Sequence, residues 1–279
     1  MPELPEVEAV ARALRPLVKG QRIRCLHVFH AVALKPQMPA ETARIVEDRY
    51  VRNVFREGKY LFLGLDRGLL EMHFRFDGQL IWFSNAIELL ARANAEEGGV
   101  HVDVALEFGK GVLGFADPRH FGRVHAWESE QACPPLKKLG MDALAEGFSA
   151  KELHARLARS KRPLKEFLLD QTRIAGIGNI YSNEALWHAR LNPWRRADSL
   201  DRKKSAQLHK AIVYVLRRAL ECCERPAPDF RDPKWWFQGL EEILRAYQRA
   251  GSPCGRCGRP IVRAEQGGRS TYYCKRCQK

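Results

Sequence analysis

The first residues of the chain combine an amine, two acids and a helix start: the sequence begins Met-Pro-Glu-Leu-Pro-Glu. We expect Met1 to be removed because the small residue Pro2 follows it, which would leave Pro2 carrying a secondary amine at the N-terminus. An α-amine titrates near roughly pH 8, so a useful fraction is a neutral nucleophile at neutral pH. Glu3 and Glu6 lie one helical turn apart beside this amine, where a general acid would serve amine chemistry at a sugar or carbonyl carbon.

The two glutamates also have a purely structural explanation. Pro5 suits the first turn of a helix. The apolar residues that follow recur at the three- to four-residue spacing of one buried helix face, namely Val7, Val10, Leu14 and Leu17. Two acids at the start of such a helix complement its dipole. Taken alone, these first residues favour the structural explanation, so other parts of the chain must decide.

Four of the eight cysteines have the spacing of a zinc ribbon. Cys254 and Cys257 form one C-x2-C pair, and after sixteen intervening residues Cys274 and Cys277 form another, which predicts one structural Zn²⁺ per chain. Strands are expected at residues 260–265 and 269–273, around a Gly-Gly turn that would project Arg269 from the hairpin tip. The other cysteines are interpreted as reduced, packed thiols: Cys25, Cys133, Cys222 and Cys223.

The charge balance indicates a polyanionic partner. The 279 residues carry a net charge of +14, with a sequence pI near 9.6, which fits nucleic acid or an anionic membrane surface. No basic amphipathic helix favours the membrane, and no apolar run is long enough to span it. We therefore expect a soluble intracellular protein that binds nucleic acid.

The pattern of apolar segments changes along the chain. Residues 1–127 hold short segments rich in Val, Ile, Leu, Phe and Tyr, which predicts a β-sandwich carrying one N-terminal helix. The expected strands span residues 21–30, 51–65, 69–76, 100–108 and 112–116. Residues 128–149 are rich in Pro and Gly and are expected to be a linker. Residues 150–251 follow a helical pattern and residues 252–279 form the ribbon, so the fold class is a multidomain α+β protein.

Within the helical region, Ser199 is expected to cap a long helix. Its apolar face is formed by Leu208, Ile212, Val215, Leu216 and Leu220. Further on, Trp235 and Trp236 stand among prolines. Adjacent tryptophans are usually core residues, but in such a loop they could also stack on a base, and the sequence leaves both interpretations open.

Residues 173–179, with the sequence RIAGIGN, lie between two helical stretches. An ordinary helix hairpin with glycine at a helix end explains this segment. A phosphate site also explains it, since Gly176 and Gly178 would let the backbone approach a phosphate and amide hydrogens at a helix start would donate to it. Nearby cations favour the second interpretation: Lys161, Arg162, Lys165 and Arg173.

These motifs in this order resemble the formamidopyrimidine-DNA glycosylase and endonuclease VIII family along nearly the whole chain. The matching stretches are MPELPEVE at 1–8, GKY at 58–60, DPRHFG at 117–122, GIGNIY at 176–181 and YCKRCQK at 273–279. Leu4 is closer to the formamidopyrimidine branch, because the endonuclease VIII branch usually has glycine there. The resemblance implies an N-terminal β-sandwich, a helical domain with a helix-two-turns-helix motif and a zinc finger.

The resemblance also implies a bifunctional DNA glycosylase and AP lyase of base-excision repair. Pro2 would attack C1′ of the damaged nucleotide and hold the sugar as a Schiff base. Glu3 would handle the protons of ring opening, and Glu6 would support the amine. Lys59 would transfer a proton in β-elimination, and Arg269 would contact the lesion phosphate in δ-elimination.

An enzyme amine reaches C1′ only when the nucleotide leaves the duplex, at a cost of roughly a few kcal/mol that inserted side chains offset. By resemblance the inserted side chains are Phe76, Arg119 and Phe121. The phosphate and backbone contacts come from Lys161, Asn179 and Gly178. The implied partner is double-stranded DNA containing a damaged base or abasic site, bound by a monomer associated with the cytoplasmic nucleoid.

Three departures from the family pattern concern lesion choice. Phe76 stands where the formamidopyrimidine branch commonly has Met, and Gly99 stands where the family has a DNA-contacting His. Residues 235–240, WWFQGL, replace a loop that closes over the flipped purine in the bacterial enzymes. We expect oxidised purines such as 8-oxoguanine and formamidopyrimidines as substrates, with oxidised pyrimidines or another lesion as alternatives.

Two non-enzymatic alternatives share the basic charge. One is a damaged-DNA-binding protein without catalysis, and the other is a zinc-ribbon RNA-binding or transcription accessory protein. Neither has a reason to retain Pro2, Glu3 and Lys59 together, as this chain does.

Overall fold

The computed structural model describes residues 2–93, 99–232, 235 and 239–279. The chain divides into two compact units. The first contains residues 1–2, 6–137 and 223–238, and the second contains residues 3–5, 138–222 and 239–279. The second unit therefore includes Glu3, although it is mainly built from the C-terminal half of the chain.

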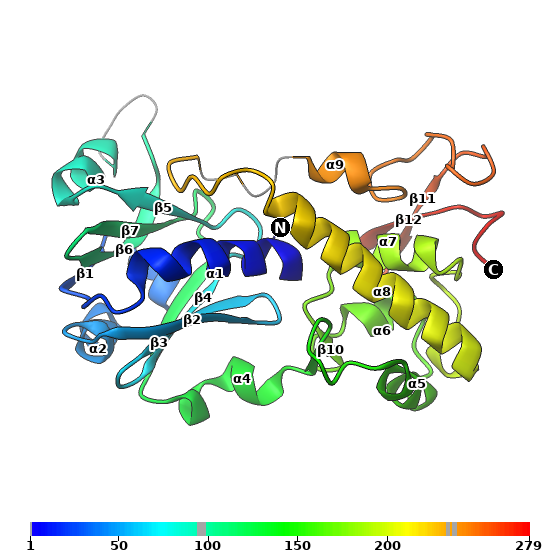
Figure 1. Cartoon of the computed structure of the whole chain (residues 1–279), viewed down its shortest axis with the longest axis horizontal. Coiled ribbons are helices and arrows are strands. Elements are labelled where there is room, and N and C mark those ends of the chain that lie inside the picture. Colours follow the sequence, from blue (N-terminus) through cyan, green and yellow to red (C-terminus); the bar gives the residue numbers. More distant parts are fainter. Residues whose placement is uncertain (1, 94–98, 233–234, 236–238) are drawn as a thin grey trace. The chain divides into compact units, whose positions relative to one another are not determined.

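Within the described residues, the first unit contains two four-stranded antiparallel sheets (Figure 1). One sheet has the order β1 (Cys25–Val28), β6 (Val102–Phe108), β7 (Gly111–Ala116) and β5 (Gln79–Phe83). The other has the order β2 (Val51–Glu57), β3 (Tyr60–Leu65), β4 (Leu69–His73) and β8 (Arg123–Trp127). The predicted sandwich of short strands is confirmed.

The strand predictions differ from the structure where a turn interrupts an apolar run. Residues 51–65, predicted as one extended segment, form the β2–β3 hairpin. The chain reverses at Gly58 and Lys59, where Gly58 adopts φ 57°, a left-handed conformation that glycine tolerates without a steric penalty. The predicted hairpin between β6 and β7 is present, with Phe108 paired to Gly111. Strands β5 and β8 were not predicted as separate elements.

Helix α1 (Leu4–Val18) carries the expected apolar face with one exception. Val7, Val10 and Leu14 are buried, but Leu17 is 37% exposed while Val18 is fully buried. The exception follows from the helical period of 3.6 residues, because four residues beyond Leu14 return closer to the buried direction than three do. The prediction of a buried Leu17 was therefore wrong by one position.

The first unit also holds shorter helical segments, namely η1 (Ala31–Leu34), α2 (Pro39–Val46), α3 (Ala86–Ala93), η2 (Glu130–Ala132) and α4 (Pro134–Lys138). The segment expected as a linker, 128–149, contains η2 and α4 and also the short strand β9 (Met141–Asp142). The boundary between the two units falls inside it, after Lys137.

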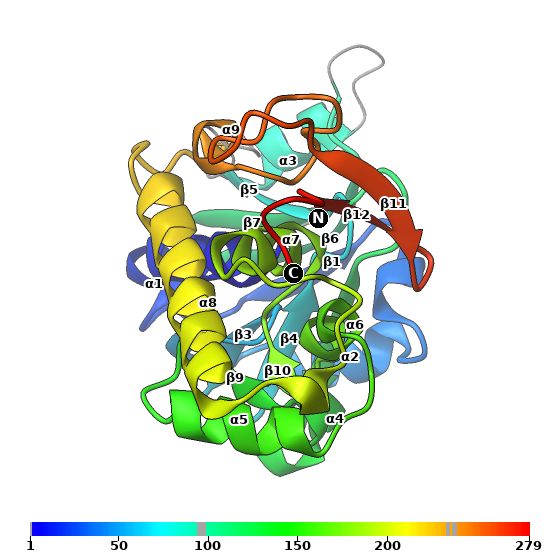
Figure 2. The same ribbon diagram turned by 90° about the vertical axis from the view of Figure 1, so that its right-hand side faces the viewer.

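The second unit is mainly helical, and Figure 2 shows its long helix α8 and the β11–β12 hairpin. Its elements are α5 (Ala150–Ala158), α6 (Leu164–Leu169), β10 (Ile174–Ala175), α7 (Asn179–His188), η3 (Ala197–Ser199), α8 (Arg202–Cys223), α9 (Leu240–Ile243), β11 (Val262–Gln266) and β12 (Arg269–Tyr273). Strand β10 pairs in parallel with β9. In the described part of the chain, no helix has both the length and the apolar character needed to cross a membrane.

The long helix α8 buries the apolar face that its sequence predicts, from Leu208 to Leu220. Its cap differs from the prediction. The amide of Lys204 donates to Oδ1 of Asp201 at 2.7 Å, whereas Ser199 lies in η3 and bonds to the carbonyl of Arg196. Asp201 is the N-cap because it immediately precedes the first helical residue and its carboxylate reaches the third amide.

Candidate functional site

The carboxylate of Glu3 lies at the N-terminus of α7, within the second unit. It accepts hydrogen bonds from the amides of Gly178 at 2.6 Å, Ile180 at 2.8 Å and Tyr181 at 3.4 Å. The side chain is almost fully buried, with Glu3 1% exposed. Unpaired amides and the positive end of the helix dipole make such a terminus a natural anion site. Here the protein's own carboxylate occupies it, so three amides fix the position of this acid.

Gly176 makes room for the residue that follows Glu3. The amide of Leu4 donates to the carbonyl of Gly176 at 3.1 Å. Gly176 has φ +99°, and a Cβ built on it would lie 2.4 Å from Cδ1 and 2.8 Å from Cβ of Leu4. The close approach expected at this glycine is present, but the partner is Leu4. The amide of Gly178 donates to the carboxylate of Glu3, so we do not propose Gly178 as a phosphate ligand.

Lys165 is a buried cation, although the sequence pattern grouped it with the lysines and arginines expected near phosphate. Its side chain, fully buried, donates from Nζ to the carbonyl of Ser270 at 2.8 Å and to Oγ1 of Thr271 at 2.7 Å. Its pKa is lowered to about 8, chiefly by burial and then by the charge of Arg269, while Glu3 acts in the opposite direction. Lys165 therefore joins α6 to β12 in a part of the second unit that also holds Glu3 and Arg269.

Arg269 is exposed at the start of β12, as predicted from the Gly-Gly turn. Gly267 and Gly268 have φ 58° and 71°, both in the left-handed region that a tight hairpin turn requires. The hairpin is fastened to the helices through Lys165 and through the amide of Tyr272, which donates to Oδ1 of Asn183 in α7 at 2.7 Å. The guanidinium is thus carried on a supported strand.

Two of the residues expected to contact phosphate, Asn179 and Lys161, lie in different surroundings. Asn179 is the first residue of α7, and its Oδ1 is buried without a hydrogen-bond partner among the described residues. Lys161 is exposed in the loop between α5 and α6. An orphaned side-chain oxygen next to a helix start is a group for which a ligand or water can supply the missing bond.

In the first unit, Pro2, Glu6 and Lys59 are all buried. Lys59 is 7% exposed and occupies the turn between β2 and β3. The pKa of His73 is lowered to about 3, chiefly by burial and then by the positive charges of Arg75 and Lys59. Lys59 is therefore held in the protein, which disfavours the alternative of a freely solvated strand-end lysine.

Phe76, Arg119 and Phe121 form an exposed cluster in the first unit, contributed by two turns. The two phenyl rings meet edge to face at 5.7 Å and are 52% and 47% exposed. The guanidinium of Arg119 lies 5.3 Å from the ring of Phe76 and 5.4 Å from that of Phe121, and it pairs with Asp77. Arg75 and His120, which immediately precede the two phenylalanines, have left-handed backbones with φ 52° and 55°. Solvent-exposed aromatic rings on strained turns are costly, and this indicates a surface built for contact.

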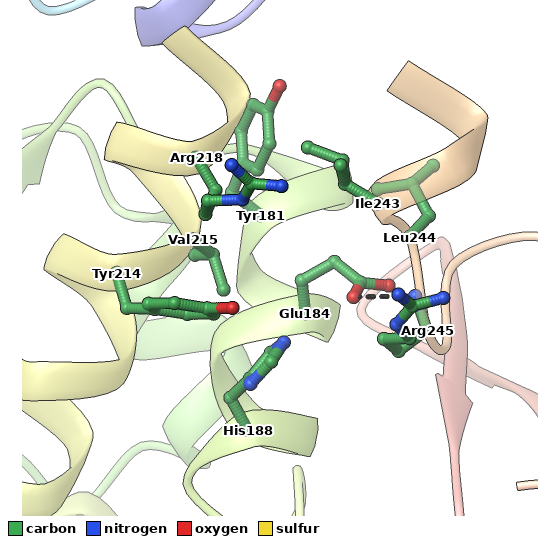
Figure 3. A pocket seen from close by; sticks show the side chains of 9 residues that line it. All are labelled: Tyr181, Glu184, His188, Tyr214, Val215, Arg218, Ile243, Leu244 and Arg245. Atoms are coloured by element: carbon green, nitrogen blue, oxygen red, sulfur yellow. Dashed lines mark hydrogen bonds between the residues drawn. The ribbon is translucent and has the colours of Figure 1, made fainter. Parts of the chain in front are cut away.

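Figure 3 shows a pocket of the second unit that the sequence did not predict. Glu184 from α7 points toward the segment after α9 and accepts hydrogen bonds from the amides of residues 245, 246 and 247, each at 2.8 Å. Burial raises the pKa of Glu184, and the three backbone donors oppose this shift. The geometry makes Glu184 an anchor for the chain that leads into the ribbon. No local sequence signal identifies it, because its partners lie some sixty residues away.

Trp235 is 3% exposed and its ring meets Phe230 edge to face at 6.0 Å, so it is a core residue of the first unit. The other residues of the expected lesion-facing loop, Trp236, Phe237 and Gln238, lie outside the described residues. Gly239 and Leu240 lead into α9.

The four ribbon cysteines converge as predicted. The sulfurs of Cys254, Cys257, Cys274 and Cys277 all lie within 4.8 Å of one another. Four thiolates at such separations suit tetrahedral Zn²⁺, with a metal–sulfur distance of about 2.3 Å. Arg256 packs against this site, with its guanidinium 3.8 Å from the centre of the Trp187 ring. The residues fit one structural zinc ion.

A sandwich domain, a glycine-turn helix pair that holds an N-terminal glutamate, and a four-cysteine finger together define a class of DNA repair protein. Family models confirm this class: "Formamidopyrimidine-DNA glycosylase N-terminal domain" matches residues 1–124, "Formamidopyrimidine-DNA glycosylase H2TH domain" matches 139–226, and "Zinc finger found in FPG and IleRS" matches 251–279.

Similar curated proteins are named formamidopyrimidine-DNA glycosylase. The protein from Chloroflexus aurantiacus is 38% identical, covering 100% of this chain and 98% of its own length. That from Pelotomaculum thermopropionicum is 36% identical, covering 100% and 99%. The chain belongs to the formamidopyrimidine-DNA glycosylase family.

Solved structures agree. The Lactococcus lactis protein Fpg (MutM), in complex with DNA containing N7-benzyl-Fapy-dG, superimposes with a TM-score of 0.87 at 28% identity over 100% of both chains. MutM (Fpg) from Thermus thermophilus gives a TM-score of 0.83 at 34% identity, covering 99% of this chain and 98% of the other. The family, the three-part fold and the zinc site predicted from the sequence are confirmed.

Proposed function

We propose that this protein is a bifunctional DNA glycosylase and AP lyase that removes an oxidised base through a Schiff base on Pro2. The proposal rests on the position of Glu3, whose carboxylate accepts hydrogen bonds from three backbone amides at the N-terminus of α7. An acid fixed by backbone donors keeps one position through a reaction, which is the preorganisation that acid–base catalysis needs. Pro2 precedes Glu3 in the chain, so the acid cannot be far from the amine.

The reaction begins when the Pro2 nitrogen forms a bond to C1′ and the bond from C1′ to the base nitrogen breaks. The base leaves with the bonding pair and takes up a proton. Opening of the sugar ring transfers a proton to O4′, a step that we assign to Glu3, and gives the iminium. Loss of a proton from C2′ expels the 3′ phosphate, and a second elimination expels the 5′ phosphate. Glu6 supports the amine, Lys59 takes part in the first elimination and Arg269 in the second.

DNA binding is proposed on two surfaces. The exposed cluster of Phe76, Arg119 and Phe121 would enter the space that the flipped nucleotide vacates, because apolar and planar groups replace lost stacking. Lys161, Asn179 and Arg269 would contact phosphates around the lesion. The net charge of +14 supports a duplex partner. We propose that a monomer associated with the nucleoid carries out this reaction.

Oxidised purines, including formamidopyrimidines and 8-oxoguanine, are the proposed lesions. The family names support the formamidopyrimidine part directly, and the DNA in the Lactococcus lactis complex carries a substituted Fapy-dG. Phe76 and residues 235–240 differ from the family pattern, so oxidised pyrimidines are the alternative. A panel of duplexes, each with one defined lesion, cut under single-turnover conditions, separates the two.

Substitutions test the chemistry itself. Glu3→Gln should retain binding to abasic duplex but release base at least about a hundredfold more slowly, the low end of the contribution of a positioned proton-transfer group. Pro2→Gly, which replaces the secondary amine assigned as the nucleophile, should also retain binding to abasic duplex and lose base release. Glu41→Gln, in α2, is a matched control that should behave as wild type. Equal strand cutting by Glu3→Gln and wild type would contradict the assignment and favour a non-catalytic DNA-binding protein.

A further inference from the structure

Three histidines meet at one end of the sheet formed by β1, β6 and β7. His30 follows β1, His101 precedes β6 and His120 lies in the turn after β7. The antiparallel pairing of these strands brings the three positions together. In addition, the amide of His30 donates to the carbonyl of Asp103 at 3.0 Å, which fixes the end of β1 beside the start of β6.

The ring nitrogens are close enough to share one ion. One nitrogen from each histidine lies within 4.8 Å of the other two. The Nε2 atoms of His101 and His120 are 3.0 Å apart, and the rings of His30 and His101 stack with centroids 4.5 Å apart. Imidazole nitrogens bound to one zinc at about 2.0–2.1 Å are about 3.3–3.6 Å from each other. Small rotations of these partly exposed rings would therefore bring all three to bonding distance.

A buried carboxylate stands behind the cluster. Asp103 is fully buried, and its Oδ1 lies 2.7 Å from Nδ1 of His120. Its Oδ2 has no hydrogen-bond partner among the described residues. A histidine that binds metal through one nitrogen usually donates from the other to a carboxylate, which fixes the ring and its tautomer. A buried carboxylate also needs a compensating positive charge, and an ion on His120 would supply it.

We propose that His30, His101 and His120 form a second metal site, distinct from the ribbon, that binds a late first-row divalent ion such as Zn²⁺. Three neutral imidazoles are a ligand set that Zn²⁺ favours, and water from the open side would complete the coordination. Asp103 orients His120 from behind and does not contact the ion. Because the site is partly exposed, the ion would exchange with solvent more readily than the ion held by four cysteines.

The site has a consequence for the neighbouring turn. His120 stands between Arg119 and Phe121 and itself has a left-handed backbone, with φ 55°. A metal bond to its ring would tie this turn to the start of β6 and the end of β1. The effect of that constraint on insertion into DNA rests on the proposed function above, whereas metal binding does not.

Equilibrium dialysis of the zinc-loaded protein against buffered Zn²⁺, followed by elemental analysis, tests the site. Wild type should hold two ions per chain at saturation. The double variant His30→Gln/His101→Gln should hold one, retained by the ribbon. His27→Gln is the matched control, because His27 lies on β1 and pairs with Glu107 outside the cluster, and it should hold two.

Two further measurements keep the test decisive. Replacing only the second ion with Co²⁺ should give a spectrum of nitrogen and oxygen ligation without sulfur-to-metal charge transfer. Asp103→Asn should weaken Zn²⁺ binding at the second site by about 10–100-fold while leaving the ribbon ion in place. One ion per wild-type chain, or a second ion that persists unchanged in the double variant, would overturn the proposal. Schiff-base formation on Pro2 is measured separately, so the two proposals can fail independently.

Discussion

Replacing Gly176 with alanine should displace Leu4 and the adjacent Glu3 from their positions against the N-terminal end of α7. The new Cβ would lie 2.4 Å from Cδ1 of Leu4, far inside contact distance, and the residue would keep φ +99°. The backbone strain costs about 1–3 kcal/mol, and the overpacking against Leu4 costs about 1–3 kcal/mol more. We expect the free energy of unfolding to fall by about 2–6 kcal/mol.

The rate of base release by Gly176→Ala should fall by more than the loss of folding stability explains. Leu4 is fully buried and bonded to Gly176, so it can escape the new methyl group only by moving its own backbone. That movement pulls the adjacent Glu3 away from the amides of α7. Under conditions where the variant remains folded, we expect single-turnover base release to slow by about tenfold or more, since one lost charge-assisted hydrogen bond is worth about 1.5–3 kcal/mol.

Gly20→Ala is the matched control. Gly20 has a similar φ of +81°, but a Cβ there meets nothing within 4 Å, so this variant reports strain without a clash. Leu4→Ala in the Gly176→Ala background should recover part of the lost stability by removing the clash. Urea unfolding measures stability, and rapid-quench assays on lesion duplex measure base release. Equal losses for Gly176→Ala and Gly20→Ala in both assays would show that the contact between residue 176 and Leu4 does not position Glu3.

Three other perturbations have expected outcomes. Glu184→Ala leaves the three amides of residues 245–247 without their acceptor and should lower the free energy of unfolding by about 3–5 kcal/mol, with Glu184→Gln less affected; equal urea midpoints would contradict this. His73 has a pKa of about 3 in the folded state against an ordinary value of 6.5. Between these two pH values His73 is protonated in the unfolded chain but neutral in the folded protein. The free energy of unfolding should therefore fall as the pH drops from 6.5 toward 3, by about 5 kcal/mol at most. His73→Asn should flatten the stability profile across this window, and an unchanged slope would argue against a buried neutral His73. Cys257→Ser should remove the ribbon zinc and weaken DNA binding through loss of an ordered Arg269; elemental analysis showing an unchanged ribbon zinc would contradict the ligand assignment.

Local sequence signals predicted the local structure well where a single local requirement, such as glycine in a tight turn, determines the conformation. The hairpin between β6 and β7 and the Gly-Gly turn before Arg269 were found because glycine is needed for the backbone of tight turns. The cap of α8 was misplaced because Ser199 and Asp201 are both good caps, and only the packing of η3 decides between them.

The candidate site depends on contacts that span the chain. Glu3 and the amides that hold it are separated by 175 to 178 residues, so no local pattern identifies the pairing. The glycines of residues 176–178 were correctly expected to permit a close approach, but the approaching group was taken to be phosphate. Lys165 was grouped with the phosphate-facing cations because a lysine on a helix is usually solvated, and only the tertiary structure shows it buried against β12.

Pro2 is proposed as the nucleophile, and borohydride trapping identifies the residue that forms the Schiff base. The protein is incubated with duplex containing a single abasic site or oxidised purine, reduced with borohydride and digested, and the cross-linked peptide is sequenced by mass spectrometry. We expect a stable adduct on the nitrogen of Pro2, in a chain that has lost Met1. An adduct on a lysine such as Lys59, or no adduct with the wild-type protein, would contradict it.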